Sequence, residues 1–368
     1  MAKKSSKPKK PPSKSARTVS IAIPVLRDFL ERMFVAAGCD LENARITADD
    51  VIEADLRGHR IQGTDHLGPI ITGLKNGTIR GKARPRILRE TPATAQVDGD
   101  GATGHVAGRF AVDVVVRKAK AVGVAVVGLV RAGDLGMLGA YVERIARAGL
   151  AGMTFTNGNP RVHVPGGIDP ILGTNPVAFG FPVQGGDPVV IDFATSAAAM
   201  GHVRIASYTD KPIAKGLAID KNGKATTNAK AAIDGAFTAI GGHKGFGLSL
   251  AGTLLSGPII GALIGRERIE SSKAGGPPER GHTIIAIDPS AFGDTATNLK
   301  KTRRYLDEIK ASRKAKGVDE ILIPGERSFR TRRKSMQRGI EILEASWRNT
   351  LQLASELGVK APDVKPVS

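Results

Sequence analysis

The chain of 368 residues carries a formal net charge of +19, with 41% hydrophobic and only 4% aromatic residues. Its length allows one large or two to three ordinary domains, and its apolar fraction excludes a disordered or fibrous protein. Cys39 is the only cysteine, which excludes a disulfide framework, and its position at the end of an expected helix predicts a buried thiol. No apolar run reaches the roughly 18 residues of a membrane span, and no signal segment is visible. We therefore expect a cytoplasmic protein without membrane contact.

The positive charge is concentrated in two segments. Residues 1–17 hold six Lys and one Arg without any acid, which predicts a disordered basic tail over 1–19. This tail either keeps the protein in solution or touches nucleic acid or anionic lipid. Nucleic acid is not the expected partner, but the basic tail leaves its binding open. Residues 300–348 hold fifteen basic and seven acidic residues at helical spacing, which indicates a solvated helix face near an anionic cofactor.

The apolar periodicity predicts helices and strands in alternation. Helices are expected at 25–38, 41–57, 65–75, 108–121, 137–148, 244–265 (broken at Pro258), 297–316 and 335–357. Strands are expected at 94–97, 124–130, 152–156, 177–181, 189–192 and 283–288, and a loop at 267–281. This order predicts a mixed α/β fold with a helical N-terminal subdomain at 20–80 that packs with 297–358. Residues 81–296 would bind cofactor and substrate, and 359–368 would be loose.

Two glycine-rich turns are candidate anion-binding sites. Residues 99–104 fit the dinucleotide pattern G-x-G-x-x-G between a strand and a helix, but the acid expected about 20 residues later is missing. A simple glycine turn explains them as well. Residues 241–247 open a helix, where backbone N–H groups and Lys244 would hold a phosphate, or they form a hinge. The carboxylate of Asp192 at a strand end would bind a ribose or amide, or the segment only caps the next helix through Thr195 and Ser196.

No metal site is expected, because the seven histidines form no H-x-x-x-H or H-E-x-x-H pair and there is no cysteine cluster. Residues 57–67, RGHRIQGTDHL, are the most informative stretch. They predict a helix end, a glycine turn and a new helix start, a junction that displays polar side chains.

Together these motifs resemble the malate/L-lactate dehydrogenase family of the second, non-Rossmann type. The segments that carry the resemblance are ADLRGH at 54–59, VDG at 97–99, LGTNP at 172–176, DFATS at 192–196, KGFGL at 244–248 and PGE at 324–326. The resemblance implies a non-Rossmann fold, NADH or NADPH as cofactor, and a homodimer with active sites near the subunit interface. It also implies hydride transfer between nicotinamide and a small 2-hydroxy/2-keto acid or a cyclic imino acid.

The resemblance further implies which residues lie against the cofactor. They are Asn157, Gly158, Asn175, Asp192, Phe193, Ala194, Lys244, Gly325, Glu326 and Arg327. The catalytic positions depart from the family pattern, which has Asp-Ser-His-Gly followed by an Arg. Here Ile61 and Gln62 replace the Ser and His, His66 replaces the Arg, and Asp134 replaces a second family histidine.

The chemistry still needs a proton donor beside the hydride carrier. Gln62 donates hydrogen bonds but exchanges no proton, and Asp134 would do so only if burial raised its pKa by two or three units, about 3–4 kcal/mol. Histidine titrates near neutral pH. We therefore predict that His66 donates the proton, Gln62 orients the substrate and Asp134 fixes the imidazole. The alternative is a family member that binds NAD(P)H without turnover.

Overall fold

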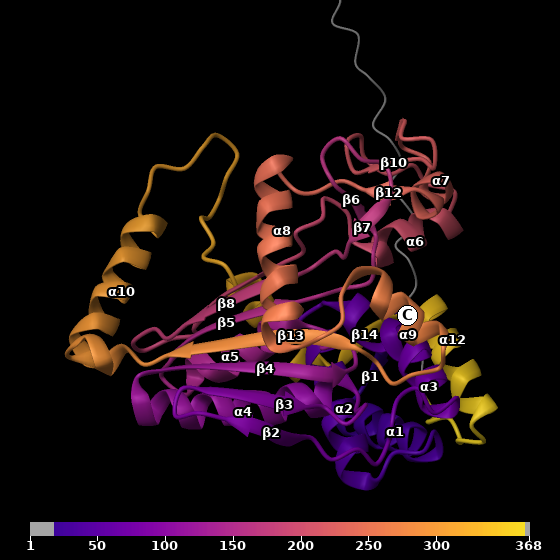
Figure 1. Cartoon of the computed structure of the whole chain (residues 1–368), viewed down its shortest axis with the longest axis horizontal. Coiled ribbons are helices and arrows are strands. Elements are labelled where there is room, and N and C mark those ends of the chain that lie inside the picture. The colour runs from indigo at the N-terminus through magenta and orange to yellow at the C-terminus, as the bar shows by residue number, and fades with distance from the viewer. Residues whose placement is uncertain (1–17, 365–368) are drawn as a thin grey trace, which may run out of the picture.

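A computed structural model describes residues 18–364, so residues 1–17 of the predicted tail lie outside the described residues. A seven-stranded sheet with the order β2-β3-β4-β13-β5-β8-β9 forms the centre (Figure 1). Its strands are β2 (Arg86–Glu90), β3 (Thr94–Asp98), β4 (Val124–Ala132), β5 (Ala151–Thr156), β8 (Val177–Phe181), β9 (Val189–Phe193) and β13 (Arg280–Ile287). Only β3 and β4 pair in parallel, and every other neighbouring pair in this sheet is antiparallel.

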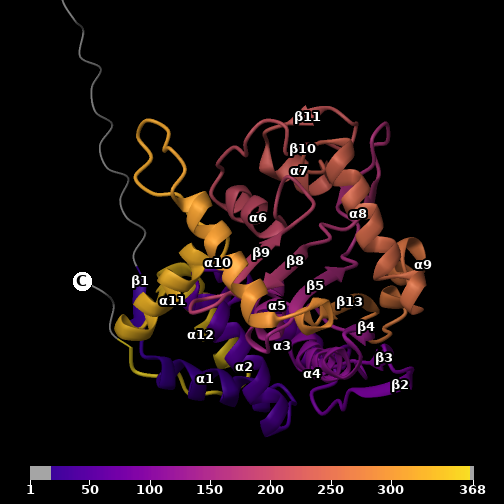
Figure 2. The same ribbon diagram turned by 90° about the vertical axis from the view of Figure 1, so that its left-hand side faces the viewer.

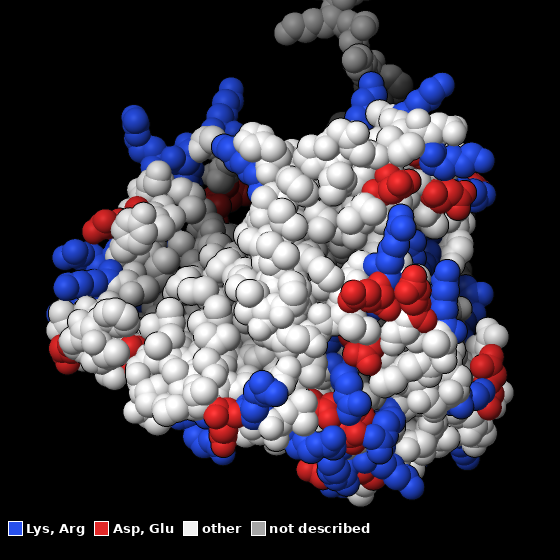
Figure 3. Space-filling model, viewed as in Figure 1, with Lys and Arg blue, Asp and Glu red and all other residues white. Residues whose placement is uncertain are grey.

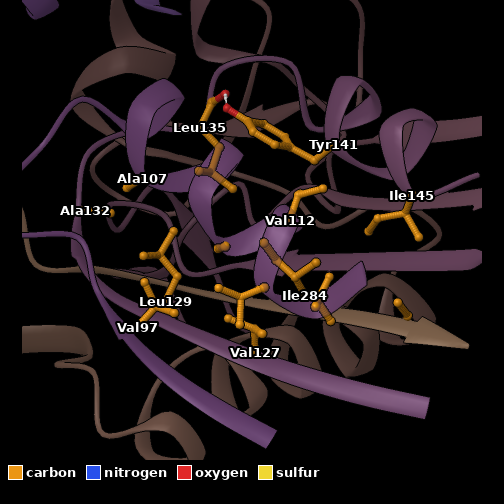
Figure 4. Close-up of a cluster of buried hydrophobic side chains, with 14 of the residues drawn as sticks. Val97, Ala107, Val112, Val127, Leu129, Ala132, Leu135, Tyr141, Ile145 and Ile284 are labelled. Carbon is orange, nitrogen blue, oxygen red and sulfur yellow. Dashed lines mark hydrogen bonds between the residues drawn. The ribbon is translucent and has the colours of Figure 1, made fainter. Parts of the chain in front are cut away.

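Helices cover both faces of this sheet. The helices α4 (Gly104–Val122) and α5 (Leu138–Arg147) bury one face, and α8 (His243–Leu255) stands on the other. The apolar run of β4 enters the core beneath α4 and α5, together with Ile284 of β13 (Figure 4). In the same core, the hydroxyl of Tyr141 donates to the carbonyl oxygen of Leu135 at 2.8 Å. This bond ties the loop after β4 to α5.

The N-terminal helices share a second core with the C-terminal end of the chain. The helices α1 (Ile23–Ala36), α2 (Leu41–Leu56) and α3 (Leu67–Lys75) pack with β14 (Ile340–Leu343) and α12 (Glu344–Glu356). Strand β1 (Thr18–Ile21) pairs antiparallel with β14. The rings of Phe29 and Trp347 meet edge to face, with centroids 5.5 Å apart. Residues far apart in sequence therefore form one helical layer.

A smaller unit lies at the opposite side of the molecule (Figure 2). Its five-stranded sheet has the order β11-β10-β12-β6-β7 and consists of β6 (Val162–His163), β7 (Pro170–Leu172), β10 (Ala218–Ile219), β11 (Ala225–Thr226) and β12 (Ala236–Phe237). The helices α6 (Met200–Tyr208) and α7 (Ala229–Asp234) pack in its core around Val203, Ala232 and Phe237.

Three helices lie outside these layers: α9 (Gly265–Lys273), α10 (Thr295–Lys310) and α11 (Glu326–Arg338). Helix α10 has no buried residue. Helix α11 is anchored by Phe329, over whose ring the guanidinium groups of Arg57 and Arg147 lie at 5.0 and 5.7 Å. Arg57 belongs to the junction that follows α2, so α11 packs directly on that junction.

The mixed α/β class is confirmed, but several expected elements are wrong. The expected loop at 267–281 begins inside helix α9 and ends inside β13. The expected helix at 335–357 is interrupted by β14, because β1 offers it a strand partner that sequence periodicity cannot show. The expected helix at 244–265 ends at Leu255, and the 3-10 turn η3 (Pro258–Ile260) follows. Strands β1 and β2 and the whole smaller unit lack a sequence prediction.

The described end of the chain also differs from the expected loose segment. Val359 and Val364 contact the N-terminal core, and the carbonyl oxygen of Lys360 accepts a hydrogen bond from Arg32 at 3.0 Å. The buried Cys39 agrees with its prediction, and burial raises the pKa of its thiol to about 12. Among residues 18–364, no single helix is long and apolar enough to cross a membrane. Only the bent pair 243–260 and 265–271 reaches that length and composition.

Candidate active site

The junction after α2 is built on a buried carboxylate. Its two 3-10 turns, η1 (Arg60–Gln62) and η2 (Thr64–His66), are separated by Gly63. The backbone N–H of Thr64 donates to Asp55 at 3.0 Å, and a Cβ at Gly63 would collide with the same carboxyl group. Only glycine therefore allows the turn to close over Asp55. Gln62 and His66 each end a separate turn and share no helix.

The Asp55 carboxyl group is itself unusual. It is 6% exposed, and its second oxygen has no hydrogen-bond partner among the described residues. Burial raises its pKa to about 7, although the Thr64 N–H and Arg60 act in the opposite direction. The junction thus rests on a group that changes charge near neutral pH.

The loop 133–136 after β4 presents the second candidate, Asp134. One carboxylate oxygen accepts the N–H of Gly136 at 2.9 Å, and the other accepts from the Arg280 guanidinium at 2.5 Å. The side chains of Asp134 and Arg280 keep 36% and 26% of their surface exposed, so this pair remains open to a ligand. Burial alone would raise the Asp134 pKa, but Arg280 and His66 hold it far below its usual range.

This charge balance opposes a role for Asp134 as a proton donor. Burial does not make Asp134 an acid at neutral pH, because the carboxylate is stabilised by its cationic neighbours and by a backbone N–H. Asp134 is therefore an anion. The charge of His66 is among the causes that lower the pKa of Asp134.

Two buried histidines, His282 and His105, pack against the loop 133–136. His282 donates through Nε2 to the Gly133 carbonyl at 3.1 Å and accepts from the Thr156 hydroxyl through Nδ1 at 2.7 Å. The carbonyl can only accept, which fixes this tautomer. Burial lowers the His282 pKa to about 3, so the ring is neutral. His105 lies against Gly136, and burial, with His66 nearby, lowers its pKa too.

The glycines of residues 99–104 shape this loop and form no nucleotide cradle. A Cβ at Gly104 would collide with the backbone of Asp134, and one at Gly99 would press on the Arg131 carbonyl at 2.8 Å. The loop after β4 therefore packs directly against these glycines, which favours the glycine-turn interpretation over the dinucleotide interpretation.

Asp192 lies at the end of β9 with an exposed side chain. One of its oxygens accepts the Gly139 N–H in the first turn of α5 at 2.7 Å. The following Phe193 and Ala194 are half-buried. The second Asp192 oxygen stays available to a ribose hydroxyl or an amide. Thr195 and Ser196, expected to cap the next helix, donate instead to the carbonyls of residues 174, 175 and 198.

Asn157, Gly158 and Asn175 form a connected group behind this edge. Asn175 is fully buried, donates to Ser249 and Thr253 of α8, and accepts the Gly158 N–H at 2.9 Å. Its side chain therefore acts within the protein, and any cofactor contact there must come from its neighbours. The buried Arg268 of α9 donates to the carbonyls of Asn157 and Gly158 at 3.0 and 2.6 Å.

The remaining cofactor candidates lie at two helix starts. Gly241 and Gly242, both at positive φ, lead into α8, where the side chain of Lys244 is exposed. Gly325 precedes α11 at φ +97°, and its neighbour Pro324 accepts the Val190 N–H of β9 at 3.2 Å. Glu326 is held by Lys310, whereas Arg327 is exposed without an ion-pair partner among residues 18–364.

Within residues 18–364, no group of three His, Cys, Asp or Glu side chains could hold a metal ion.

The structure thus joins Asp134 and His66 with two residues that sequence reasoning missed. Arg280 and His105 carried no motif, and Arg280 lies within the expected loop at 267–281 although it begins β13 in the structure. Arg268 was missed because its segment is polar and ends in Gly-Gly-Pro-Pro, a composition typical of loops.

The profile of a family described as malate/L-lactate dehydrogenase matches residues 21–350. This chain belongs to that family. The family's dehydrogenases and reductases act on hydroxy acids and imino acids, and the chain is an oxidoreductase.

Relatives and solved structures agree with this membership. The L-sulfolactate dehydrogenase of Methanocaldococcus jannaschii is 38% identical over 89% of this chain and 94% of its own length. The structure of malate dehydrogenase from Entamoeba histolytica has a TM-score of 0.89 at 29% identity, covering 94% of this chain and all of that one. The Δ1-piperideine-2-carboxylate reductase structure from Pseudomonas syringae has a TM-score of 0.82 at 31% identity, covering 91% and 99%.

Proposed function

We propose that this member of the malate/L-lactate dehydrogenase family transfers a hydride between NADH or NADPH and a small 2-hydroxy/2-keto acid or cyclic imino acid. The observation that carries the proposal is the partly exposed ion pair of Asp134 and Arg280, whose carboxylate also responds to the charge of His66. It provides an anion, a cation and a titratable imidazole on one open surface. A cytoplasmic location remains a prediction.

The residues at the site fit a nicotinamide dinucleotide. Lys244 and the first N–H groups of α8 suit a phosphate, and the free oxygen of Asp192 suits a hydroxyl or the carboxamide. Backbone groups of Asn157, Gly158, Phe193, Ala194 and Gly325 would line the path between them. When bound, the dinucleotide supplies the hydride for the substrate carbon.

We assign a chemical role to each polar residue of the site. The His66 imidazolium gives its proton to the substrate oxygen or nitrogen, and in the reverse direction the neutral ring takes it back. The carboxylate of Asp134 stabilises that imidazolium, and the half-buried Gln62 donates a hydrogen bond to the substrate. The family arginine is replaced by His66, so we assign the grip on the substrate carboxylate to Arg280, whose exposed edge can bind it.

The test follows cofactor absorbance with a panel of 2-keto acids and cyclic imines. His66→Ala should lower kcat about 10²–10⁴-fold, whereas His202→Ala, an exposed histidine on α6, should turn over normally. Normal turnover in both His66→Ala and Asp134→Asn would refute the assignment. Fluorescence-detected cofactor binding without any turnover would instead support the alternative of a catalytically impaired family member.

We also infer that two copies associate through the outer face of α8. Leu250, Leu254 and Ile259 are 38%, 44% and 74% exposed along that side. Uncharged atoms fill the centre of this view, and charged residues lie at its margins (Figure 3). Exposed apolar patches of this kind mark association surfaces. Light scattering should give the mass of a dimer, and Leu254→Glu should give a monomer. A monomeric wild-type protein at micromolar concentration contradicts this inference.

A further inference from the structure

A cationic cavity of about 440 Å³ lies between α11 and the segment that precedes it. Its lining consists of Leu322, Arg327, Arg330, Thr331, Arg333, Lys334 and Gln337. Four of these seven side chains are cations and none is an acid. A cavity with this lining selects an anionic ligand, because the cations otherwise repel one another.

Two of the four cations are available to a ligand. Arg330 is bound by Glu320, and Arg333 is bound by Asp187 at 2.6 Å. Arg327 and Lys334 form no side-chain hydrogen bond or ion pair within residues 18–364, and both are exposed. They are seven residues apart, two turns of α11, and so lie on the same face of the helix.

The acid that precedes Arg327 in the sequence, Glu326, is already neutralised. Both oxygens of Glu326 accept from the Lys310 ammonium, at 2.6 and 2.8 Å, and one also accepts the Ile323 N–H at 3.2 Å. An acid that selects NADH must offer its oxygens to the ribose hydroxyls, whereas a nearby Arg accommodates a 2′-phosphate. Here Glu326 is occupied by Lys310, whereas Arg327 and Lys334 have no partner among the described residues.

The cavity adjoins the proposed cofactor path. Pro324 is bonded to Val190 of β9, two residues before Asp192. On the other side, the Ser328 hydroxyl lies 3.4 Å from Nε2 of His59, at the start of the catalytic junction. Burial, with help from Arg57 and Arg327, lowers the pKa of His59, so this ring is a neutral neighbour of the cavity.

We infer that this cavity receives the adenosine 2′-phosphate, bound by Arg327 and Lys334, and that the enzyme therefore uses NADPH in preference to NADH. This inference rests on the proposed function and extends it. Arg327 can bind the phosphate through two parallel N–H donors, and Lys334 adds a point charge. Thr331, between them on the same face, offers a hydroxyl.

The experiment measures the dissociation constants of NADPH and NADH by fluorescence, and those of 2′,5′-ADP and 5′-ADP by calorimetry. We expect NADPH and 2′,5′-ADP to bind at least tenfold more tightly than their partners without the 2′-phosphate. Arg327→Gln and Lys334→Gln should each reduce this ratio, and the double variant should bring it close to one. Arg338→Gln is the matched control, since it removes an exposed charge from the same helix outside the cavity lining.

Equal affinity for NADPH and NADH in the wild-type protein overturns the inference, and so does a preference that survives in the double variant. Both results leave the proposed function standing if either dinucleotide supports turnover. The absence of binding by both dinucleotides removes the proposed function together with this extension of it.

Discussion

The roles of single residues in the candidate site depend on their charge state more than on their residue type. Asp55 and Asp134 are both carboxylic acids near the same junction, yet burial raises the pKa of one and cationic neighbours lower that of the other. Asp134 therefore acts as an anion across the neutral range. Asp55 instead gains or loses its proton near neutral pH, because its pKa is about 7.

This difference predicts the pH dependence of stability for Asp55→Asn. The folded pKa of Asp55, about 7, lies above the unfolded value of about 3.9. The folded state therefore holds its proton longer, and wild-type stability is lost as the pH rises from about 4 to about 7. Relative to the wild type, the variant should gain roughly 2–4 kcal/mol between pH 4 and pH 8. Urea unfolding at several pH values measures the gain.

The exposed Asp113 on α4 provides the control, because its charge is not among those that shift Asp55. Asp113→Asn should follow the wild-type pH dependence, because water solvates this carboxylate in the folded and the unfolded chain. If Asp55→Asn also follows the wild-type curve, the buried carboxyl does not titrate as described.

A second prediction at this scale concerns the ion pair in the site. Arg280→Met leaves Asp134 without its cation, so the pKa of that carboxyl should rise toward the ordinary range as its main opposing charge disappears. KM for a 2-keto acid should increase, since the proposed carboxylate grip is lost. The pH profile of kcat/KM and the KM value are the measurements, and an unchanged KM contradicts the grip.

Helices and strands position these residues, and the sequence predicts those elements that local apolar patterns determine. Helices α1, α2 and α5 and strands β4, β5, β8 and β9 follow from apolar periodicity within a few residues. Strands β1 and β14 depend on one another across more than three hundred residues, so no local window shows them. For the same reason Arg268 and Arg280 were missed, because their partners lie more than one hundred residues away.

The turn between β3 and α4 yields a prediction at the element scale. Gly104→Ala places a methyl group against the Asp134 backbone, so the loop must move and stability should fall by about 1–3 kcal/mol. Turnover should fall as well, because the loop carries Asp134. Thermal unfolding and kcat are the measurements. Gly68→Ala in α3, where nothing lies within 4 Å of the new methyl, should be neutral or stabilising.

At the scale of the whole molecule, N-terminal and C-terminal elements of the described chain share the core beside the junction at 57–67. The junction follows α2, whose core partners include β14 and α12. Trp347→Ala opens a cavity beside Phe29 and should destabilise the protein by about 3–5 kcal/mol. Chemical unfolding followed by fluorescence of an extrinsic dye measures the loss. Phe292→Ala, at a side chain 77% exposed, should change stability by less than about 0.5 kcal/mol.

The shared core of the chain ends also affects how the protein is made. A ribosome that has released the first three helices must add about 270 more residues before β14 and α12 emerge, roughly 15–50 s at ordinary translation rates. Until then Phe29, Leu30 and Met33 have no tryptophan to cover them. We expect the nascent N-terminal segment to depend on chaperones during that interval. Premature termination before β14 should give insoluble polypeptide even though every residue of the proposed active site has been translated.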